Sequence, residues 1–278
     1  MKRVFPAAAV AAALLLAAAP ARATSSVTST LHGLVFALDD LDPDDGVAPS
    51  LVLDPRAHST AFAGAGTGFG NVVASWSQQG GSAFGAASAS GDLDGSGGAA
   101  SFAGDPQAGG AQLVASAMAG PSLLLGLASA LVSNPEQGGF VLSAHTRVAL
   151  FGATTIDWSA SSPDAAAFGE IDLALWLVTN DGGSDELSQS YATAGYYGLG
   201  DGPLAGSVPY GVAVDLENDS DQSVVVGYEA DVFAQAGEML SVPPPVDEPS
   251  GAGLLVAGTA ALLAAARRRL NGGSGACR

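Results

Sequence analysis

The chain has 278 residues, and its 27 acidic side chains face only nine lysines and arginines. All the acidic residues lie between Asp39 and Glu248, where Arg56 and Arg147 are the only arginines and lysine does not occur. This balance repels phosphate groups and anionic lipid, so we expect no nucleic-acid partner. The single cysteine, Cys277, excludes a disulfide framework and a cysteine-rich metal centre within the body of the protein.

The N-terminus has the pattern of a secretory signal peptide. Lys2 and Arg3 precede an apolar run over residues 4–19, and the small-residue site Ala21-Arg22-Ala23 follows. A charged segment, an apolar segment and an A-x-A site in this order predict export and cleavage. We therefore expect a signal helix within residues 1–23 and a mature protein that begins at Thr24.

Residues 24–241 are long enough for one large or two small domains, and one all-β domain of this length is ordinary. Several segments alternate apolar and polar side chains with the period of a half-buried strand. Strands at this spacing without long helical patterns predict an all-β fold, an antiparallel β-sandwich of jelly-roll type. The stretch 121–133 is also compatible with a short helix. The glycine, alanine and serine density of residues 60–112 suggests long loops or partial disorder. The predicted strands lie near residues 31–38, 49–54, 71–77, 111–118, 139–144, 146–159, 171–178, 210–217 and 222–234.

Two of these segments predict a β-hairpin. Residues 210–217 and 222–234 each carry one apolar face, and Asn218-Asp219-Ser220-Asp221 between them has the composition of a turn. In residues 171–178 both faces are mostly apolar, which indicates a strand in the interior of a sheet.

Calcium is the first candidate ligand, because carboxylate oxygens at alternating positions can surround a hard cation. The densest cluster is Asp40, Asp42, Asp44 and Asp45 before Gly46. Acidic loops whose aspartates cap turns are the alternative. Two weaker clusters are Asp92 with Asp94, and Glu217 with Asp219 and Asp221.

Catalysis has little support in the sequence. Neither a G-x-S-x-G elbow nor an H-E-x-x-H motif occurs. The histidines are His32, His58 and His145, and we expect His32 to lie on the apolar strand face of Leu34 and Phe36. Glu170 and Asp172 share a predicted strand face, a spacing compatible with glycoside hydrolysis but common among so many carboxylates. We expect a protein that is not an enzyme.

Carbohydrate binding is a further candidate function. Tyr191, Tyr196 and Tyr197 lie in one glycine-bounded segment and could present aromatic rings to sugars. Ordinary packing on an edge strand is the alternative interpretation.

The C-terminus contains three distinct elements in succession. An acidic, proline-rich linker covers residues 242–250, an uncharged helical segment with an arginine cluster covers 251–269, and a short tail covers 270–278. The segment is just long enough for one transmembrane helix, and Arg267, Arg268 and Arg269 would hold its C-terminal end in the cytoplasm. We therefore expect residues 24–241 to lie outside the inner membrane.

This order resembles the sorting region of the PEP-CTERM exported proteins of Gram-negative bacteria. In that family a Pro-Glu-Pro signature precedes a short hydrophobic helix and a basic cluster. Here Asp247-Glu248-Pro249 occupies the signature position, with Asp247 in place of the first proline, and Arg267 to Arg269 form the cluster. Residues 38–46 also resemble uncharacterised members of the same group. The resemblance implies processing by an exosortase-type transpeptidase, release to the cell surface or extracellular matrix, and a structural or adhesive role beside exopolysaccharide.

Overall fold

The computed structural model describes residues 24–54, 58–67, 71–80, 84–120, 124–133, 139–178, 184–197 and 203–238. The predicted signal peptide (1–23), linker (242–250), transmembrane segment (251–269) and tail (270–278) lie outside these residues.

The described residues form strands and connecting turns, and no helix occurs among them. Each strand pairs in the antiparallel sense with its neighbours. The prediction of an all-β, antiparallel fold is therefore confirmed. The strands are β1 (Ser25–Asp40), β2 (Leu51–Leu53), β3 (His58–Gly66), β4 (Val72–Gln79), β5 (Ala87–Leu93), β6 (Ser96–Asp105), β7 (Gly110–Ala119), β8 (Leu125–Ser133), β9 (Phe140–Leu142), β10 (Thr146–Ala160), β11 (Ala165–Val178), β12 (Ser184–Tyr196), β13 (Ala205–Asn218) and β14 (Val224–Glu238).

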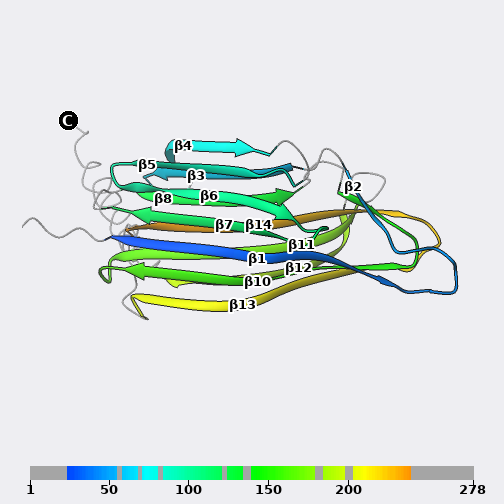
Figure 1. The fold of residues 1–278 in the computed structure, drawn as a ribbon. Helices are drawn as coiled ribbons and strands as arrows, with labels where there is room; N and C mark the ends of the chain where they lie inside the picture. The colour runs from blue at the N-terminus through cyan, green and yellow to red at the C-terminus, as the bar shows by residue number, and fades with distance from the viewer. Residues whose placement is uncertain are drawn as a thin grey trace, which may run out of the picture. The chain divides into compact units, whose positions relative to one another are not determined.

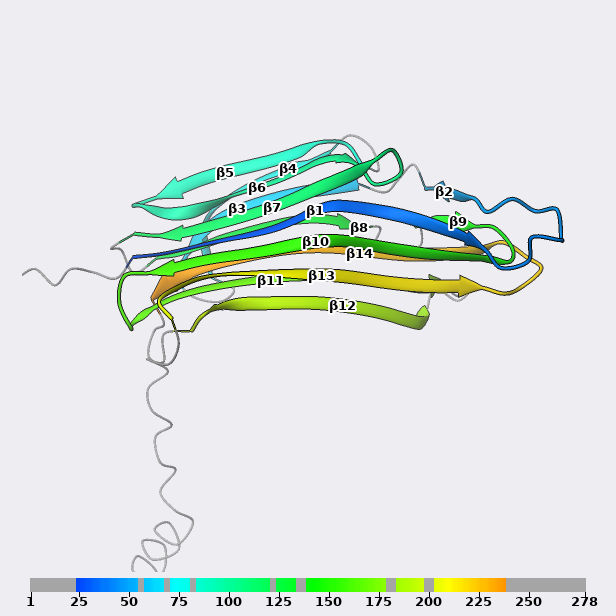
Figure 2. The same cartoon turned by 60° about the horizontal axis from the view of Figure 1, so that its bottom comes forward.

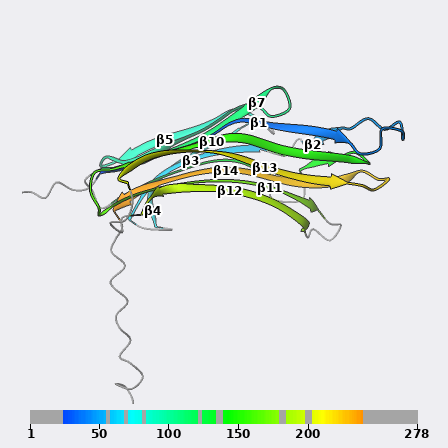
Figure 3. The ribbon, with the colours of Figure 1, turned by 90° about the horizontal axis from the view of Figure 1, so that it is seen from below.

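The strands make two sheets that lie one over the other (Figures 1 and 2). The first, called sheet A, has the order β13-β10-β1-β7-β6-β5. The second, sheet B, has the order β12-β11-β14-β8-β3-β4, with the short strands β9 and β2 added beside β14. Figure 3 shows the two layers edge-on, with β1, β10 and β13 of sheet A above β11, β12 and β14 of sheet B. The chain crosses repeatedly between the sheets, so neighbours in sequence often lie in different layers.

The core lies between the two sheets and consists largely of alanine, with leucine, isoleucine and valine. Larger side chains gather near the ends of β2 and β9, where Phe36, Phe140 and Tyr228 meet with ring centroids 5.5 to 5.9 Å apart. Aromatic pairs at such distances add stabilisation to that of area burial alone. The hydroxyl of Tyr228 has no hydrogen-bond partner among the described residues, although the residue is only 1% exposed.

The sheets approach closely where glycine replaces a core side chain. A Cβ atom at Gly126 of β8 would clash with the carbonyl oxygens of Met118 and Gly97, which belong to the facing strands β7 and β6. A Cβ at Gly98 would similarly clash with the carbonyl oxygen of Leu127. Close packing in a protein interior leaves no room for additional atoms here.

The described residues of the range 60–112 are mostly strand rather than loop, so the expectation of long loops or disorder is wrong for them. They contain β3 to β6 and the start of β7, and the small side chains of these strands fill the narrow space between the sheets. The stretch 121–133 contains β8 from Leu125 onward, so the short-helix alternative is wrong for that part. Glycine, alanine and serine have low strand preference, but tertiary packing outweighs it.

A β-bulge shifts the alternation of β1. The register with β10 and β7 changes just after His32, next to Gly33, whose φ of +64° favours glycine. As a result Leu31 and Leu34 are both buried while His32 is exposed. The expectation that His32 shares the apolar face of Leu34 is therefore wrong.

The predicted hairpin of residues 210–217 and 222–234 is not formed. Strand β13 pairs with β10 in sheet A, whereas β14 pairs with β11, β8 and β9 in sheet B. The connection at Asn218–Asp221 thus carries the chain from one sheet to the other. Both strands do present an apolar face to the core, but β13 packs over β11 and β12, whereas β14 packs over β1 and β7.

Both pairs of outer strands are joined across the layers. The backbone N–H of Ser88 on β5 donates to Gln78 on β4 at 2.9 Å, and the N–H of Asp215 on β13 donates to Ser188 on β12 at 3.3 Å. In addition, the Trp76 ring occupies the space above Gly91 of β5. A large ring that covers a glycine on a neighbouring strand protects the exposed backbone there.

Candidate functional site

Four carboxylates lie together on the outer face of sheet B. Asp172 of β11 stands directly opposite Asp231 of β14. Glu170 lies two residues from Asp172 along β11, and Glu229 lies two residues from Asp231 along β14, so alternation brings all four to the same face. We call Glu170, Asp172, Glu229 and Asp231 the carboxylate tetrad. Sequence reasoning had paired only Glu170 with Asp172.

The tetrad is partly removed from water. Burial, reinforced by the Asp231 and Asp172 charges, raises the pKa of the Glu229 carboxyl. Burial also raises the pKa of Asp231, and the hydrogen bond from the Ser129 hydroxyl at 2.8 Å opposes this only in part. Asp172 accepts a hydrogen bond from Gln189 at 2.8 Å through Oδ2, while its Oδ1 is buried without a partner among the described residues. Neighbouring carboxylates that are both ionised and partly buried repel each other, which is unfavourable.

Aromatic side chains surround this acidic patch. Tyr191 of β12 pairs directly with Asp172 and is 70% exposed. Phe168 lies next to Glu170 along the same face and contacts the rings of Tyr197 and Phe233, with centroids 5.6 and 6.5 Å apart. Trp176 lies at the opposite end of the face, over Gly227.

Among the three predicted tyrosines, Tyr196 differs from its neighbours. It is 2% exposed and donates its hydroxyl to the carbonyl of Pro163 at 3.3 Å, so it is a core residue and cannot contact a sugar. Tyr191 and Tyr197 are exposed, at 70% and 47%. Burial and the Glu170 carboxylate raise the pKa of Tyr197.

A second cluster lies where three loops meet at one end of the sandwich. Atoms of Asp42, Asp45 and His145 that could bind a metal lie within 4.8 Å of one another. The His145 Nε2 is 2.9 Å from Asp221 Oδ1 and 4.0 Å from Asp45 Oδ2. His145 itself adopts a φ of +47° in the turn before β10. We call Asp42, Asp45, His145 and Asp221 the loop cluster.

The four predicted calcium ligands do not converge as a single set. Asp40 ends β1 and its carboxylate accepts the N–H of Asp42 at 3.1 Å, which is an ordinary turn-capping bond. Asp44 donates its own N–H to Asp42 at 3.3 Å and is not part of the group that meets His145. Only Asp42 and Asp45 of the predicted four therefore lie beside another potential ligand.

The two weaker acidic clusters have structural roles. Asp92 accepts the N–H of Gly95 at 3.2 Å in the tight turn between β5 and β6, where Asp94 and Gly95 both have positive φ. Glu217 lies 3.7 Å from the guanidinium of Arg147, which also donates two hydrogen bonds to Asp215. Asp221 joins the loop cluster instead.

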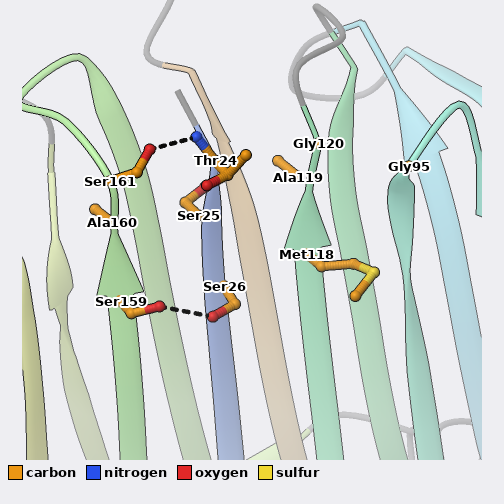
Figure 4. A pocket seen from close by; sticks show the side chains of 10 residues that line it. All are labelled: Thr24, Ser25, Ser26, Gly95, Met118, Ala119, Gly120, Ser159, Ala160 and Ser161. Atoms are coloured by element: carbon orange, nitrogen blue, oxygen red, sulfur yellow. Dashed lines mark hydrogen bonds between the residues drawn. The ribbon is translucent and has the colours of Figure 1, made fainter. Parts of the chain in front are cut away.

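A pocket of about 400 Å³ lies at the opposite end, where β1 begins (Figure 4). The backbone N–H of Thr24 donates to Ser161 at 2.7 Å, and Ser26 is 2.9 Å from Ser159. Serine, threonine, glycine, alanine and one methionine line the pocket. A lining without ionisable side chains offers hydrogen bonds but no acid, base or nucleophile of shifted pKa.

The structure adds His145, Glu229 and Asp231 to the residues that the sequence singled out for these sites. Glu229 and Asp231 share the alternation of β14, but the register that places Asp231 against Asp172 depends on pairing between segments about 60 residues apart. His145 meets Asp42 and Asp45 only through the meeting of two distant loops. His58, the remaining histidine, begins β3.

Together these features define an antiparallel two-sheet β-sandwich with an acidic and aromatic outer face. Comparison of the chain with protein-family models, with curated proteins and with solved structures gives no match in any of the three. Within the described strands and turns, no helix is long and apolar enough to span a membrane. The predicted sorting residues Asp247, Glu248, Pro249, Arg267, Arg268 and Arg269 lie outside the described part of the chain.

Proposed function

We propose that this is an exported, non-enzymatic protein of the cell surface or extracellular matrix that adheres to polysaccharide through the outer face of sheet B. The predicted signal peptide and the PEP-CTERM-like tail support export, passage through the inner membrane and processing by an exosortase-type enzyme. The row formed by Tyr191, Asp172 and Asp231 is the observation that carries the binding role.

This row combines the two features that sugar recognition needs. Tyr191 exposes an aromatic ring on which the apolar face of a pyranose can pack, and the adjacent carboxylates accept hydrogen bonds from hydroxyl groups. Trp176 and Phe168 extend the aromatic surface along β11 in both directions. A sheet face several strands wide suits an extended chain better than a small molecule, which normally occupies a concave pocket.

The jelly-roll connectivity expected from the sequence belongs to this proposal. Crossings between the sheets at β7 to β8, β10 to β11 and β13 to β14 support it. Residues 24–241 would then act as one adhesive domain outside the cell.

The binding role is tested by affinity gel electrophoresis in the presence of the host's exopolysaccharide. We expect the polysaccharide to retard the wild-type domain but not the double variant Tyr191→Ala and Trp176→Ala. Phe151→Ala is the control, because Phe151 is also exposed, at 42%, but lies in sheet A. Equal mobility of all three proteins with and without polysaccharide would reject the binding role.

The export role has a separate test. The intact mass and cell fraction of the native protein are compared in the host and in a strain lacking its exosortase. A surface form that begins at Thr24 and ends near Pro249 only when the enzyme is present supports the proposal. A form that retains Arg278 in the inner membrane of both strains contradicts it.

Metal binding by the loop cluster is a second candidate function. The imidazole of His145 beside two carboxylates favours a borderline cation such as Zn²⁺ over calcium, which prefers six or more oxygens. Thermal melting with Zn²⁺, Ca²⁺ or chelator tests this. We expect stabilisation by Zn²⁺ that His145→Ala abolishes and Asp44→Ala preserves; identical melting curves in all conditions would reject it.

A further inference from the structure

We propose that the polysaccharide recognised by the outer face of sheet B is cationic, a polymer of amino sugars with free amino groups. This inference rests on the proposed binding function and specifies its ligand class. It follows from an excess of negative charge on that face which the described residues leave uncompensated.

The carboxylate tetrad has no permanent cation beside it in the described residues. Arg147 is the one arginine there, and it lies on β10 in the other sheet, 2.8 Å from Asp215. His58 of β3 is the only histidine on the tetrad's sheet, and it is separated from Glu229 by Ser133 of the intervening strand. Tyr191 and Tyr197 are the nearby phenols. The patch therefore attracts a positive partner.

The position of the charges makes this attraction specific. Asp172 and Asp231 stand directly opposite each other, an arrangement that destabilises a sheet when both are ionised. Asp172 Oδ1 is buried and has no hydrogen-bond donor among the described residues, so little inside the protein offsets the charge of this carboxylate. An ammonium group that lies on the outer face above Asp172 and Asp231 would supply positive charge and donors to their accessible oxygens at once, and charge-assisted hydrogen bonds of this kind are the strong ones.

The geometry favours ammonium groups over a metal ion. Within the described residues, the only set of three or more ligand atoms that converge within 4.8 Å is that of Asp42, Asp45 and His145, so the tetrad does not form a coordination shell. Its carboxylates instead occupy successive positions along β11 and β14. Such a row matches charges repeated along a polymer.

The aromatic surroundings point to the same ligand. An exposed ring such as that of Tyr191, beside Asp172, attracts an ammonium ion through its π face and also packs against apolar ring surfaces. Trp176 offers a second ring on β11. Carboxylates and aromatic rings together distinguish an amino sugar from a neutral sugar and from a simple cation.

Isothermal titration tests the inference with three probes of equal length, namely glucosamine oligosaccharides, their N-acetylated forms and β-1,4-glucose oligosaccharides. The proteins are the wild type, the double variant Asp172→Asn and Asp231→Asn, and a control double variant, Asp94→Asn and Asp157→Asn. Both control positions are exposed and lie in sheet A or its turn. The two double variants have the same net charge.

We expect the glucosamine probe to bind best, with a loss of at least about tenfold in affinity in Asp172→Asn and Asp231→Asn and little change in the control. Equal binding of all three probes, unaffected by the tetrad variant, overturns the cationic ligand but leaves carbohydrate binding intact. An equal loss in both double variants overturns it as well, because the attraction is then that of overall charge. Binding of no probe, together with unretarded mobility in exopolysaccharide, overturns both proposals.

Discussion

Asp172 and Asp231 face each other across two neighbouring antiparallel strands, with a phenol on one side and two glutamates nearby. Burial raises the pKa of Asp231, which means that the folded state holds the proton more tightly than the unfolded chain does. The contribution of this group to stability is therefore greatest at pH values below its unfolded pKa. It is lost as the pH rises through the folded pKa.

The first prediction follows from this loss of stability with rising pH. Asp231→Asn keeps an oxygen for the Ser129 hydroxyl but removes the charge, so the variant should be more stable than the wild type at neutral pH by about 0.5–1 kcal/mol. The advantage should disappear toward pH 4. Urea denaturation at both pH values measures it, with the exposed Asp157→Asn as control; an advantage that is independent of pH would contradict the assignment to the partly buried charge of Asp231.

The close approach of the sheets gives a second prediction. Gly126→Ala should lower the free energy of unfolding by about 1–3 kcal/mol, because the added methyl group meets backbone oxygens of the facing sheet. At Gly211 a Cβ atom meets nothing within 4 Å. Gly211→Ala should change stability by less than about 0.5 kcal/mol. Chemical denaturation compares the two, and equal effects would argue against contact between the sheets at β8.

Tyr228 provides a third prediction. Its buried hydroxyl has no partner among the described residues, so Tyr228→Phe should stabilise the protein by about 1 kcal/mol. Tyr196→Phe is the matched comparison, because it loses the hydrogen bond to Pro163 and should destabilise by a similar amount. Thermal melting distinguishes the two. A destabilised Tyr228→Phe variant would show that a water molecule satisfies the hydroxyl.

The crossing between β13 and β14 gives a fourth prediction. The side-chain amide of Asn218, which is 4% exposed, donates to the carbonyls of Ser143 and Gln222, each at 2.8 Å. Asn218→Ala removes both bonds and leaves buried acceptors, so a loss of about 1–3 kcal/mol is expected. The adjacent and exposed Asp219 serves as control. If Asp219→Ala reduced the unfolding midpoint as much as Asn218→Ala, general loop damage would be the cause.

The sequence predicted the faces of the longer strands but not their partners. Alternation correctly placed Glu170 and Asp172 on one face of their strand, because the side-chain period in a strand is two. It could not show that β13 and β14 belong to different sheets, since strands paired in one sheet and strands of opposite sheets carry the same pattern. The bulge at Gly33 left only a glycine as its signal, which is too common in this chain to be informative.

The candidate sites could likewise be predicted only where their residues lie close together in the sequence. Asp42 and Asp45 were recognisable as potential ligands from their density in the sequence, but the contribution of His145 depends on the meeting of distant loops. Likewise, Glu170 with Asp172 was visible as an alternating pair, whereas Asp231 joins them only through strand register. Which residues share a face of one strand can be predicted from the sequence. Which residues meet across paired strands or between distant loops cannot.

The links at Ser88 with Gln78 and at Asp215 with Ser188 have a consequence for a protein that would be concentrated in a matrix. An uncovered outer strand can pair with the outer strand of another copy and begin a growing fibril. Here each outer strand of one sheet is tied to an outer strand of the other, and the backbone N–H groups of Ser88 and Asp215 are used within the same chain. The two links therefore reduce the number of free backbone donors with which crowded copies of the domain could pair.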